Sequence, residues 1–211
     1  MRAVIFANGE FPDPQAHRGL LRPDDLLIAA DGGAAHARAA GATPHVVVGD
    51  MDSLPPSLRD ELAAAGTRFV TRPAAKDETD LELALLYAVE QGAREILVLA
   101  ALGGRLDQLV ANLLLLAHPA LTGATVRLVE GPQSAFLIRD QARIEGQPGD
   151  TVSLIPLGGD AHGVTTAGLR WPLHDETLRF GPARGVSNVL LGREARVTVR
   201  EGVVVCVVTR K

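Results

Sequence analysis

The residues best suited to do chemistry are aspartates that directly follow short apolar runs. Asp50 and Asp52 come after HVVV, in Gly49-Asp50-Met51-Asp52-Ser53, and Asp31 comes after LLIAA. Two carboxylates one residue apart in a loop can converge on a hard cation, and Mg²⁺ takes oxygen ligands while keeping waters and substrate phosphates. The spacing therefore predicts that Asp50 and Asp52 bind a metal. Asp31 begins Asp31-Gly32-Gly33 before a predicted helix, so a helix N-cap and a role in the site are equally compatible with its position.

A second cluster of charged residues begins another predicted helix, in Lys76-Asp77-Glu78-Thr79-Asp80-Leu81-Glu82. Acidic residues suit the first turn of a helix, and Thr79 with Glu82 fits a capping box. Lysine can also neutralise phosphate oxygens while carboxylates hold metal or orient a hydroxyl. Alone this cluster is a weak signal, but beside Asp50 and Asp52 it favours a functional site.

A third segment, Gly103-Gly104-Arg105-Leu106-Asp107, follows the apolar run ILVLAAL and also begins a helix. A tight turn with a helix cap is one interpretation. The other places Arg105 on phosphate with Asp107 in a supporting role, and we favour it. Glycines allow close backbone approach, and helix N-termini offer N–H groups to anions.

The segments at Asp31, at Asp50 and Asp52, and at 103–107 each follow a predicted strand, and all of them lie in the first half of the chain, which has an α/β pattern. The order of elements predicts a mostly parallel sheet with helices on both faces, because continuously apolar strands alternate with helices. Ligands of such a sheet bind beyond the carboxyl ends of its strands. The predicted strands are 3–7, 26–30, 45–49, 68–71, 95–100 and 125–130, and the predicted helices are 33–41, 55–65, 79–91 and 106–118.

After Gly131 the pattern changes to short strand-like runs separated by Gly and Pro. We predict an α/β nucleotide-binding domain over residues 1–131 and an all-β antiparallel sandwich over residues 132–211. The runs EARVTV and VVVCVVT flank Arg200-Glu201-Gly202, which is predicted to be the loop of a β-hairpin.

Composition excludes several other classes of protein. The formal net charge is -4 and the pI about 5.9, which argues against a nucleic-acid partner. The N-terminus lacks a signal-peptide pattern, and no apolar run approaches the roughly 20 residues that span a bilayer. The single cysteine, Cys206, suits a buried strand better than a reactive thiol. We expect a cytoplasmic protein without a membrane partner.

Taken together, the motifs resemble the thiamine pyrophosphokinase (thiamine diphosphokinase) family almost from end to end. Each motif is short, but eight of them in the family's order make a specific signal. They are Ala7-Asn8-Gly9-Glu10, Asp31-Gly32-Gly33-Ala34, Gly49-Asp50-Met51-Asp52-Ser53, Lys76-Asp77-Glu78-Thr79-Asp80, Gly103-Gly104-Arg105-Leu106-Asp107, Ser153-Leu154-Ile155-Pro156-Leu157, Gly168-Leu169-Arg170-Trp171-Pro172-Leu173 and Gly185-Val186-Ser187-Asn188.

The resemblance implies that thiamine and ATP give thiamine diphosphate and AMP, with Mg²⁺, in a homodimer whose thiamine site lies at the subunit interface. We assign Asp50, Asp52 and Asp80 to the metal. Asp31 and Asp77 would support it or orient the hydroxyl, and Lys76 and Arg105 would offset triphosphate charge. The remaining nucleotide-site candidates are Asn8, Gly32, Gly33, Gly103, Gly104 and Asp107.

The second half supplies the candidates for binding thiamine itself. Trp171, the only tryptophan, suits a domain core or interface. In the family-like interpretation it stacks on the aminopyrimidine ring. Ser187 and Asn188 fit a simple turn or hydrogen bonds to the pyrimidine edge. Gln108 stands where many bacterial members carry histidine, so a titrating role there is in doubt.

Three alternatives share parts of this pattern. A pyrophosphokinase for another flat heterocyclic alcohol, such as a hydroxymethylpterin, would keep the reaction and change the acceptor. A phosphatase of the haloacid-dehalogenase type would use Asp50 and Asp52 as nucleophile and acid, but it normally carries that pair after its first strand. A non-catalytic thiamine or nucleotide sensor would be expected to lose the carboxylates, which are all present here.

Overall fold

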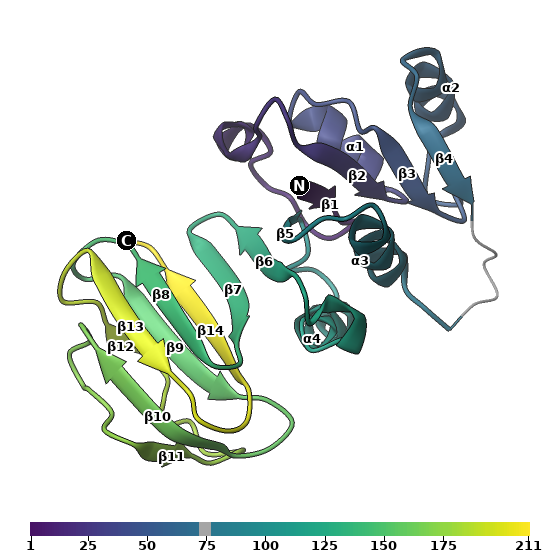
Figure 1. Ribbon diagram of the computed structural model, residues 1–211. Helices are drawn as coiled ribbons and strands as arrows, with labels where there is room; N and C mark the ends of the chain where they lie inside the picture. Colours follow the sequence, from purple (N-terminus) through teal and green to yellow (C-terminus); the bar gives the residue numbers. More distant parts are fainter. Residues whose placement is uncertain (72–76) are drawn as a thin grey trace. The chain divides into compact units, whose positions relative to one another are not determined.

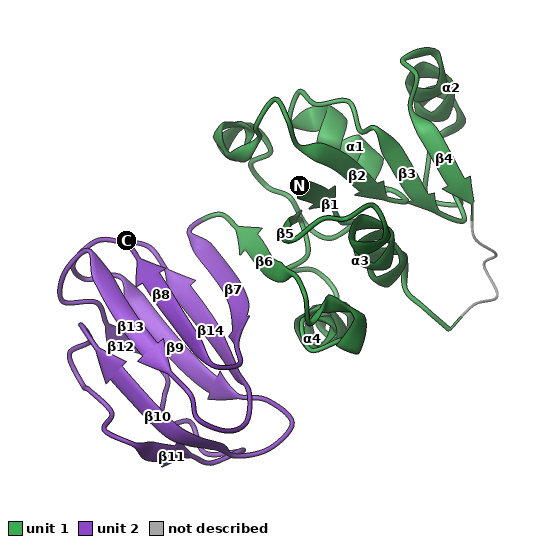
Figure 2. Cartoon of the chain, in the orientation of Figure 1, with its two compact units in different colours: residues 1–131 green, residues 132–211 purple. Residues whose placement is uncertain are grey.

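A computed structural model describes residues 1–71 and 77–211, and Lys76 lies outside this range. The chain divides into two compact units, Met1–Gly131 and Pro132–Lys211, coloured separately in Figure 2. Every helix in the described residues is too short or too polar to cross a bilayer.

The first unit is built on parallel strands in the order β6-β5-β1-β2-β3-β4 (Figure 1). Each strand and helix predicted from the sequence in this unit is present, and the ends differ by three residues at most. The central strands are almost wholly buried, as continuous runs of Val, Ile and Ala require. The strands are β1 Arg2–Phe6, β2 Leu26–Ala30, β3 Val46–Gly49, β4 Arg68–Thr71, β5 Glu95–Leu99 and β6 Thr125–Glu130.

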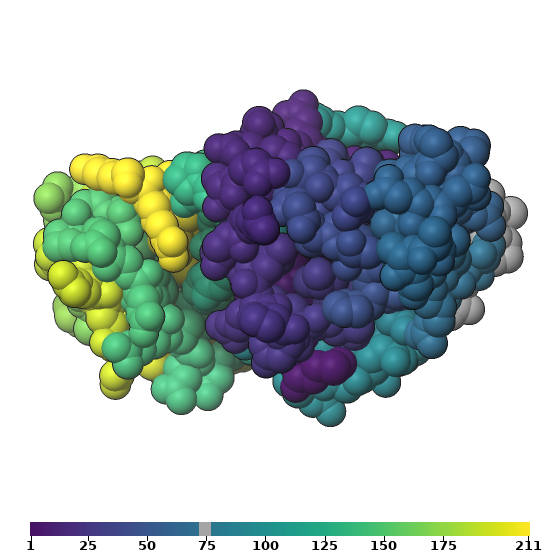
Figure 3. Space-filling model, turned by 90° about the horizontal axis from the view of Figure 1, so that it is seen from above, coloured from purple at the N-terminus to yellow at the C-terminus, as the bar shows by residue number. Residues whose placement is uncertain are grey.

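Helices cover both faces of this sheet, as predicted. On β4, Phe69 contacts Arg59 of α2, whereas Arg68, which points to the opposite face, lies over the Tyr87 ring of α3. Figure 3 shows the face formed by the purple-to-blue segments, which include α1 and α2. The helices are α1 Gly33–Ala39, α2 Pro56–Ala64, α3 Asp80–Glu90 and α4 Leu106–Leu115, with short 3₁₀ turns η1 Gln15–Leu20 and η2 Pro119–Leu121 that the sequence pattern did not predict.

The second unit consists of two antiparallel sheets, with strand orders β12-β9-β14-β7 and β11-β10-β13-β8. Its core combines Phe136, Leu154 and Cys206 from the first sheet with Val164 and Val197 from the second. The predicted antiparallel sandwich is therefore confirmed, and Cys206 is buried in it. The strands are β7 Gln133–Ile138, β8 Gln141–Glu145, β9 Thr151–Pro156, β10 Ala161–Ala167, β11 Glu176–Leu178, β12 Asn188–Val189, β13 Glu194–Thr198 and β14 Val204–Thr209.

The predicted hairpin around Arg200-Glu201-Gly202 is wrong. β13 pairs with β8 and β10, whereas β14 pairs with β7 and β9, so the loop passes from one sheet to the other. Glu201 instead forms an isolated bridge with His162. A short strand-like run identifies each of the two strands, but the run does not specify the partner strand, which depends on long-range packing.

Candidate active site

The chemistry-bearing segments of the first unit follow the carboxyl ends of its parallel strands. Asn8 follows β1, Asp31 follows β2, Asp50 follows β3 and the glycines at 103 and 104 follow β5. Parallel strands deliver such segments to one edge of the sheet, where open α/β proteins bind ligands.

Asp31 is buried, with 2% exposure, and adopts the left-handed conformation at φ 44°. Its N–H donates to the carbonyl of Val48 at 2.9 Å, and its Oδ2 accepts from the N–H of Ser53 at 3.2 Å. Oδ1 is buried and has no hydrogen-bond partner among the described residues. Burial raises the pKa of Asp31; the Ser53 hydrogen bonds lower it, and the Asp80 charge raises it further.

Asp31 does not cap α1, so the helix-cap interpretation of this residue is wrong. The N-cap of α1 is Gly32, and no side chain caps that helix. The Asp31 carboxylate points instead to the turn after β3, where its Oδ2 accepts from Ser53.

The turn after β3 brings Asp50 and Asp52 beside Asp31. The Asp52 N–H donates to Asp50 Oδ1 at 3.1 Å, and Ser53 Oγ donates to Asp52 Oδ1 at 3.0 Å. Between them Met51, at φ 68°, packs into the core. One carboxylate oxygen from each of the three aspartates lies within 4.8 Å of the others. This separation suits carboxylates that share one hard cation.

Asp80 adds a fourth carboxylate. It is the first residue of α3, whose N-cap Thr79 accepts a hydrogen bond from the Glu82 N–H at 3.2 Å, which is one of the two bonds of the predicted capping box. Its Oδ1 would lie 3.1 Å from a Cβ built on Gly49. Gly49 therefore leaves the space that allows Asp80 to approach the turn after β3.

Close backbone approach explains two of the predicted glycines. A Cβ on Gly33 would lie 2.0 Å from the carbonyl oxygen of Phe6, and one on Gly32 would lie 2.6 Å from the Asn8 amide. The start of α1 thus sits directly against the end of β1, which brings Asn8 close to the loop that carries Asp31.

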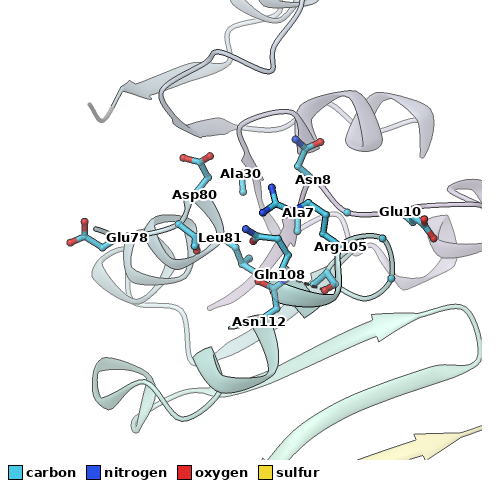
Figure 4. Close-up of a pocket in the computed structure, with 15 residues that line it drawn as sticks. Ala7, Asn8, Glu10, Ala30, Glu78, Asp80, Leu81, Arg105, Gln108 and Asn112 are labelled. Carbon is cyan, nitrogen blue, oxygen red and sulfur yellow. Dashed lines mark hydrogen bonds between the residues drawn. The ribbon is translucent and has the colours of Figure 1, made fainter. Parts of the chain in front are cut away.

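A cavity of about 620 Å³ lies at the same edge of the sheet (Figure 4). Figure 4 shows Asn8, Asp80, Arg105 and Gln108 around it. Asn8 follows β1, Asp80 begins α3, and the other two lie at the start of α4. Its volume is in the range of small-molecule and cofactor sites. The residues that line it are Ala7, Asn8, Gly9, Glu10, Ala30, Glu78, Thr79, Asp80, Leu81, Ala101, Gly103, Gly104, Arg105, Gln108 and Asn112.

Arg105 and Asp107 form an exposed ion pair, with 2.6 Å between Arg105 Nη2 and Asp107 Oδ2. The bond to Arg105 and the N–H of Gln108 lower the pKa of Asp107, and the same pair raises the pKa of Arg105. Arg105 lines the cavity, whereas Asp107 does not. Asp107 is thus placed to orient the guanidinium.

The predicted residues therefore divide into two adjoining sets. Asn8, Gly103, Gly104 and Arg105 line the cavity, and Asp31, Asp50 and Asp52 form the carboxylate group. Asp80 belongs to both, since it lines the cavity and its charge acts on Asp31. Neither set includes Asp77, Gly32, Gly33 or Asp107, and Lys76 is outside the described residues.

Five polar residues that line the cavity were not assigned to the site from the sequence, namely Glu10, Glu78, Thr79, Gln108 and Asn112. The Glu10 side chain lies against Gly103 and Gly104, which have positive φ. Gln108 and Asn112 are one helical turn apart on α4 and both line the cavity. Asn112 Nδ2 donates to the Ala101 carbonyl at 2.8 Å, while its buried Oδ1 has no partner in the described part of the chain. The i, i+4 spacing was the available signal for this pair.

The thiamine candidates of the second unit lie close together. Trp171 is 57% exposed, and the guanidinium of Arg170 lies 5.6 Å from the centre of its ring. Ser187 has φ 63°, and its N–H donates to Ser153 Oγ at 3.0 Å. Trp171 is therefore an exposed aromatic surface and does not belong to the core of its unit.

Two family models match this chain. One, described as the thiamin pyrophosphokinase catalytic domain, covers residues 17–128, and the other, the thiamin pyrophosphokinase vitamin B1 binding domain, covers residues 140–204. This chain belongs to the thiamine pyrophosphokinase family.

Thiamine pyrophosphokinases from other organisms are similar to this chain in sequence and in fold. The protein of that name from Bacillus subtilis is 27% identical over 185 residues, which cover 86% of each chain. Thiamine pyrophosphokinase 1 from rice (Oryza sativa) is 31% identical over 166 residues, covering 74% of this chain and 62% of the rice protein. The crystal structure of the B. subtilis thiamine pyrophosphokinase superposes with a TM-score of 0.89 at 26% identity, covering 100% of both chains.

Proposed function

We propose that this protein transfers a diphosphoryl group from ATP to the hydroxyl of thiamine, giving thiamine diphosphate and AMP. Family membership supports the reaction, and the observation that carries the site is the group of Asp31, Asp50 and Asp52 joined to the cavity by Asp80. The hydroxyl oxygen forms a bond to the β-phosphorus, the bond from that phosphorus to the oxygen that bridges the α- and β-phosphorus breaks, and AMP leaves with that oxygen. The hydroxyl proton passes to a carboxylate of the group.

The carboxylates suit Mg²⁺ because they are oxygen donors and because a buried Asp31 oxygen lacks a partner in the described part of the chain. Asp50, Asp52 and Asp80 would hold the ion, and the short separations extend this set to Asp31. When bound, Mg²⁺ neutralises negative charge on the phosphates. Without a cation, four carboxylates would repel the polyphosphate that the cavity is proposed to bind.

The other residues bind and align the nucleotide. Arg105, held by Asp107, would offset charge on the triphosphate, with Lys76 as a second cation. Asn8 and the close-packed glycines at 32 and 33 would bring backbone N–H groups to the phosphates. Gly103 and Gly104 would let the loop after β5 approach the nucleotide closely. Alignment and charge neutralisation supply most of the acceleration in phosphoryl transfer.

Thiamine recognition is assigned to the second unit. The exposed face of Trp171 would stack on the aminopyrimidine, and Ser187 would lie near the ring edge. A homodimer with thiamine at the subunit interface is part of the same proposal and rests on the family resemblance. Light scattering coupled to size exclusion measures the oligomeric state directly.

The deciding experiment is mass spectrometry of the products after incubation with ATP, thiamine and Mg²⁺. Thiamine diphosphate and AMP should appear together, and only with the metal. AMP formed with a hydroxymethylpterin but not with thiamine would transfer the proposal to another heterocyclic alcohol. Phosphate release from simple phosphomonoesters without ATP would favour a phosphatase.

A further inference from the structure

Trp171 lies at the end of a short antiparallel ribbon in the second unit. Leu169 and Leu190 form a β-bridge, the Arg170 N–H donates to the Val189 carbonyl at 2.9 Å, and the Leu191 N–H donates to Gly168 at 3.0 Å. The next residue of the first segment is Trp171, which lies opposite Asn188. Since hydrogen-bonded and non-hydrogen-bonded pairs alternate in an antiparallel ladder, the ladder offers Trp171 no backbone partner on the opposite segment.

The side chain of Asn188 supplies the hydrogen bonds that the ladder does not provide for Trp171. Asn188 Oδ1 accepts from the Trp171 N–H at 3.1 Å, and Asn188 Nδ2 donates to the Trp171 carbonyl at 2.7 Å. A carboxamide carries the donor and acceptor of a peptide group, so it can replace one. Both backbone polar groups of Trp171 are therefore held by one side chain.

Asn188 is itself held in place from two sides. Its Oδ1 also accepts from the N–H of Val189 at 2.8 Å, so the oxygen is shared by two donors. The preceding residue, Ser187, has φ 63° and is bonded through its N–H to Ser153 Oγ at 3.0 Å. A left-handed residue stabilised in this way fixes the direction in which the Asn188 side chain leaves the chain.

We propose that Asn188 is a positioning residue, which holds the Trp171 backbone so that the exposed indole is a rigid platform for a flat heterocycle. Its oxygen accepts two hydrogen bonds and one of its two N–H groups donates to the Trp171 carbonyl, so we assign its effect on the ligand to Trp171, and a direct contact with the ligand is the alternative that the kinetics below test. The ligand part of this inference rests on the proposed thiamine site. A platform fixed before binding avoids the ordering cost that a mobile aromatic side chain would incur.

The first test uses Trp171 as its own probe, because it is the only tryptophan in the chain. In the full-length protein without substrate, Asn188→Ala and Asn188→Asp should both increase nanosecond motion in the anisotropy decay of Trp171. Asn188→Asp keeps an acceptor for the Trp171 N–H but places an oxygen against its carbonyl. The matched control is Thr165→Val, which removes a similar side-chain bond, from the Asp175 N–H at 3.0 Å, and should leave the decay unchanged.

The second test is a double-mutant cycle in steady-state kinetics. Asn188→Ala should raise KM for thiamine roughly 5- to 10-fold with little change in kcat, as for the loss of about one hydrogen bond. In a Trp171→Ala background the same change should add almost nothing, because the platform is already absent. Independent, multiplicative losses would mean that Asn188 contacts thiamine directly and would overturn the positioning role.

The two proposals fail in different ways. An unchanged anisotropy decay in both Asn188 variants overturns the positioning role, whatever the kinetics. A normal KM for thiamine in Trp171→Ala overturns the stacking part of the proposed function. The anisotropy result still decides whether Asn188 holds the Trp171 backbone.

Discussion

At the scale of single residues, the most informative feature is how the group of Asp31, Asp50 and Asp52 affects the stability of the folded protein when no cation is bound. Asp31 is buried, one of its oxygens has no partner among the described residues, and the charge of Asp80 acts on it. An unpartnered buried carboxylate is destabilising, so it persists where function requires it. The same residues that would bind the cation thus lower the stability of the empty protein.

The carboxylate group can be tested with Asp50→Asn. Turnover should fall by about 10²-fold or more, because a neutral amide neither attracts a cation nor offsets its charge. Thermal unfolding should be little changed or slightly improved. The matched control is Asp60→Asn on the exposed face of α2, which should retain full activity. Near-normal turnover in Asp50→Asn would refute the metal assignment.

A second residue-scale prediction concerns Glu130, at the end of β6. Both of its carboxylate oxygens are buried without a partner among the described residues. Burial raises its pKa; the charge of His17 lowers it by a smaller amount, and the charge of Glu10 raises it by less still. The folded protein therefore binds this proton more tightly than the unfolded chain does. Stability from Glu130 is present below its ordinary pKa and is lost as pH rises through the raised value.

Glu130→Gln should accordingly raise the melting temperature at neutral pH, and the gain should shrink as pH falls towards 4.5, its ordinary pKa. Calorimetric scans of wild type and variant across this range measure the difference. Glu90→Gln, at an exposed position on α3, is the control and should show no such gain. A gain that grows at acid pH would have the wrong sign and would contradict the burial argument.

At the scale of elements, the site depends on how closely α1 and β1 approach. α1 is short and rich in alanine, and its buried Ala34 and Ala37 let it lie close to the sheet. Gly33 is the closest point, where a side chain would meet the backbone of Phe6. Backbone cannot move aside as a flexible side chain can, so this contact sets the position of the loop that carries Asp31 and Gly32.

Gly33→Ala should therefore destabilise the protein by about 1–3 kcal/mol or more, the range for overpacking a well-packed interior. Activity should also fall, since the loop carrying Asp31 must shift. Denaturant unfolding and turnover measure the two effects. Gly19→Ala is the control, because a Cβ there meets nothing within 4 Å. Equal stability of the two variants would show that α1 can move away from β1 at little cost.

At the scale of the whole molecule, each unit has a hydrophobic core of its own. The core of residues 132–211 combines side chains from both of its sheets, including Leu154 and Val197. A chain of this size can fold alone if its core is complete. The division also separates the proposed tasks, with phosphate chemistry in the first unit and the aromatic platform in the second.

Residues 132–211 made alone should then unfold in one cooperative thermal transition with a β-rich circular dichroism spectrum. Leu154→Ala should lower the stability of this fragment by about 2–5 kcal/mol, the usual range for such a deletion in a core. The same substitution in the full chain should have a similar effect. A fragment without a cooperative transition would show that this core is insufficient by itself.

Much of the fold could be predicted from the sequence because its signals are local. Continuous Val and Ile runs alternating with helical segments identify the parallel strands and helices of the first unit. This alternation ends after Gly131, where the structure divides into its two units. Aspartates and glycines after strands also identified the edge where the cavity lies, because parallel strands place their carboxyl ends together.

Only the tertiary structure decided the contacts between distant segments. Asp31 lies beside Asp50 and Asp52, and Glu10 and Asn112 line the cavity. The strands β13 and β14 belong to different sheets. The tertiary structure also directed the Asn188 amide to the Trp171 backbone. Residue type and spacing show what a side chain can bond, but its partner depends on long-range packing, which local periodicity does not encode.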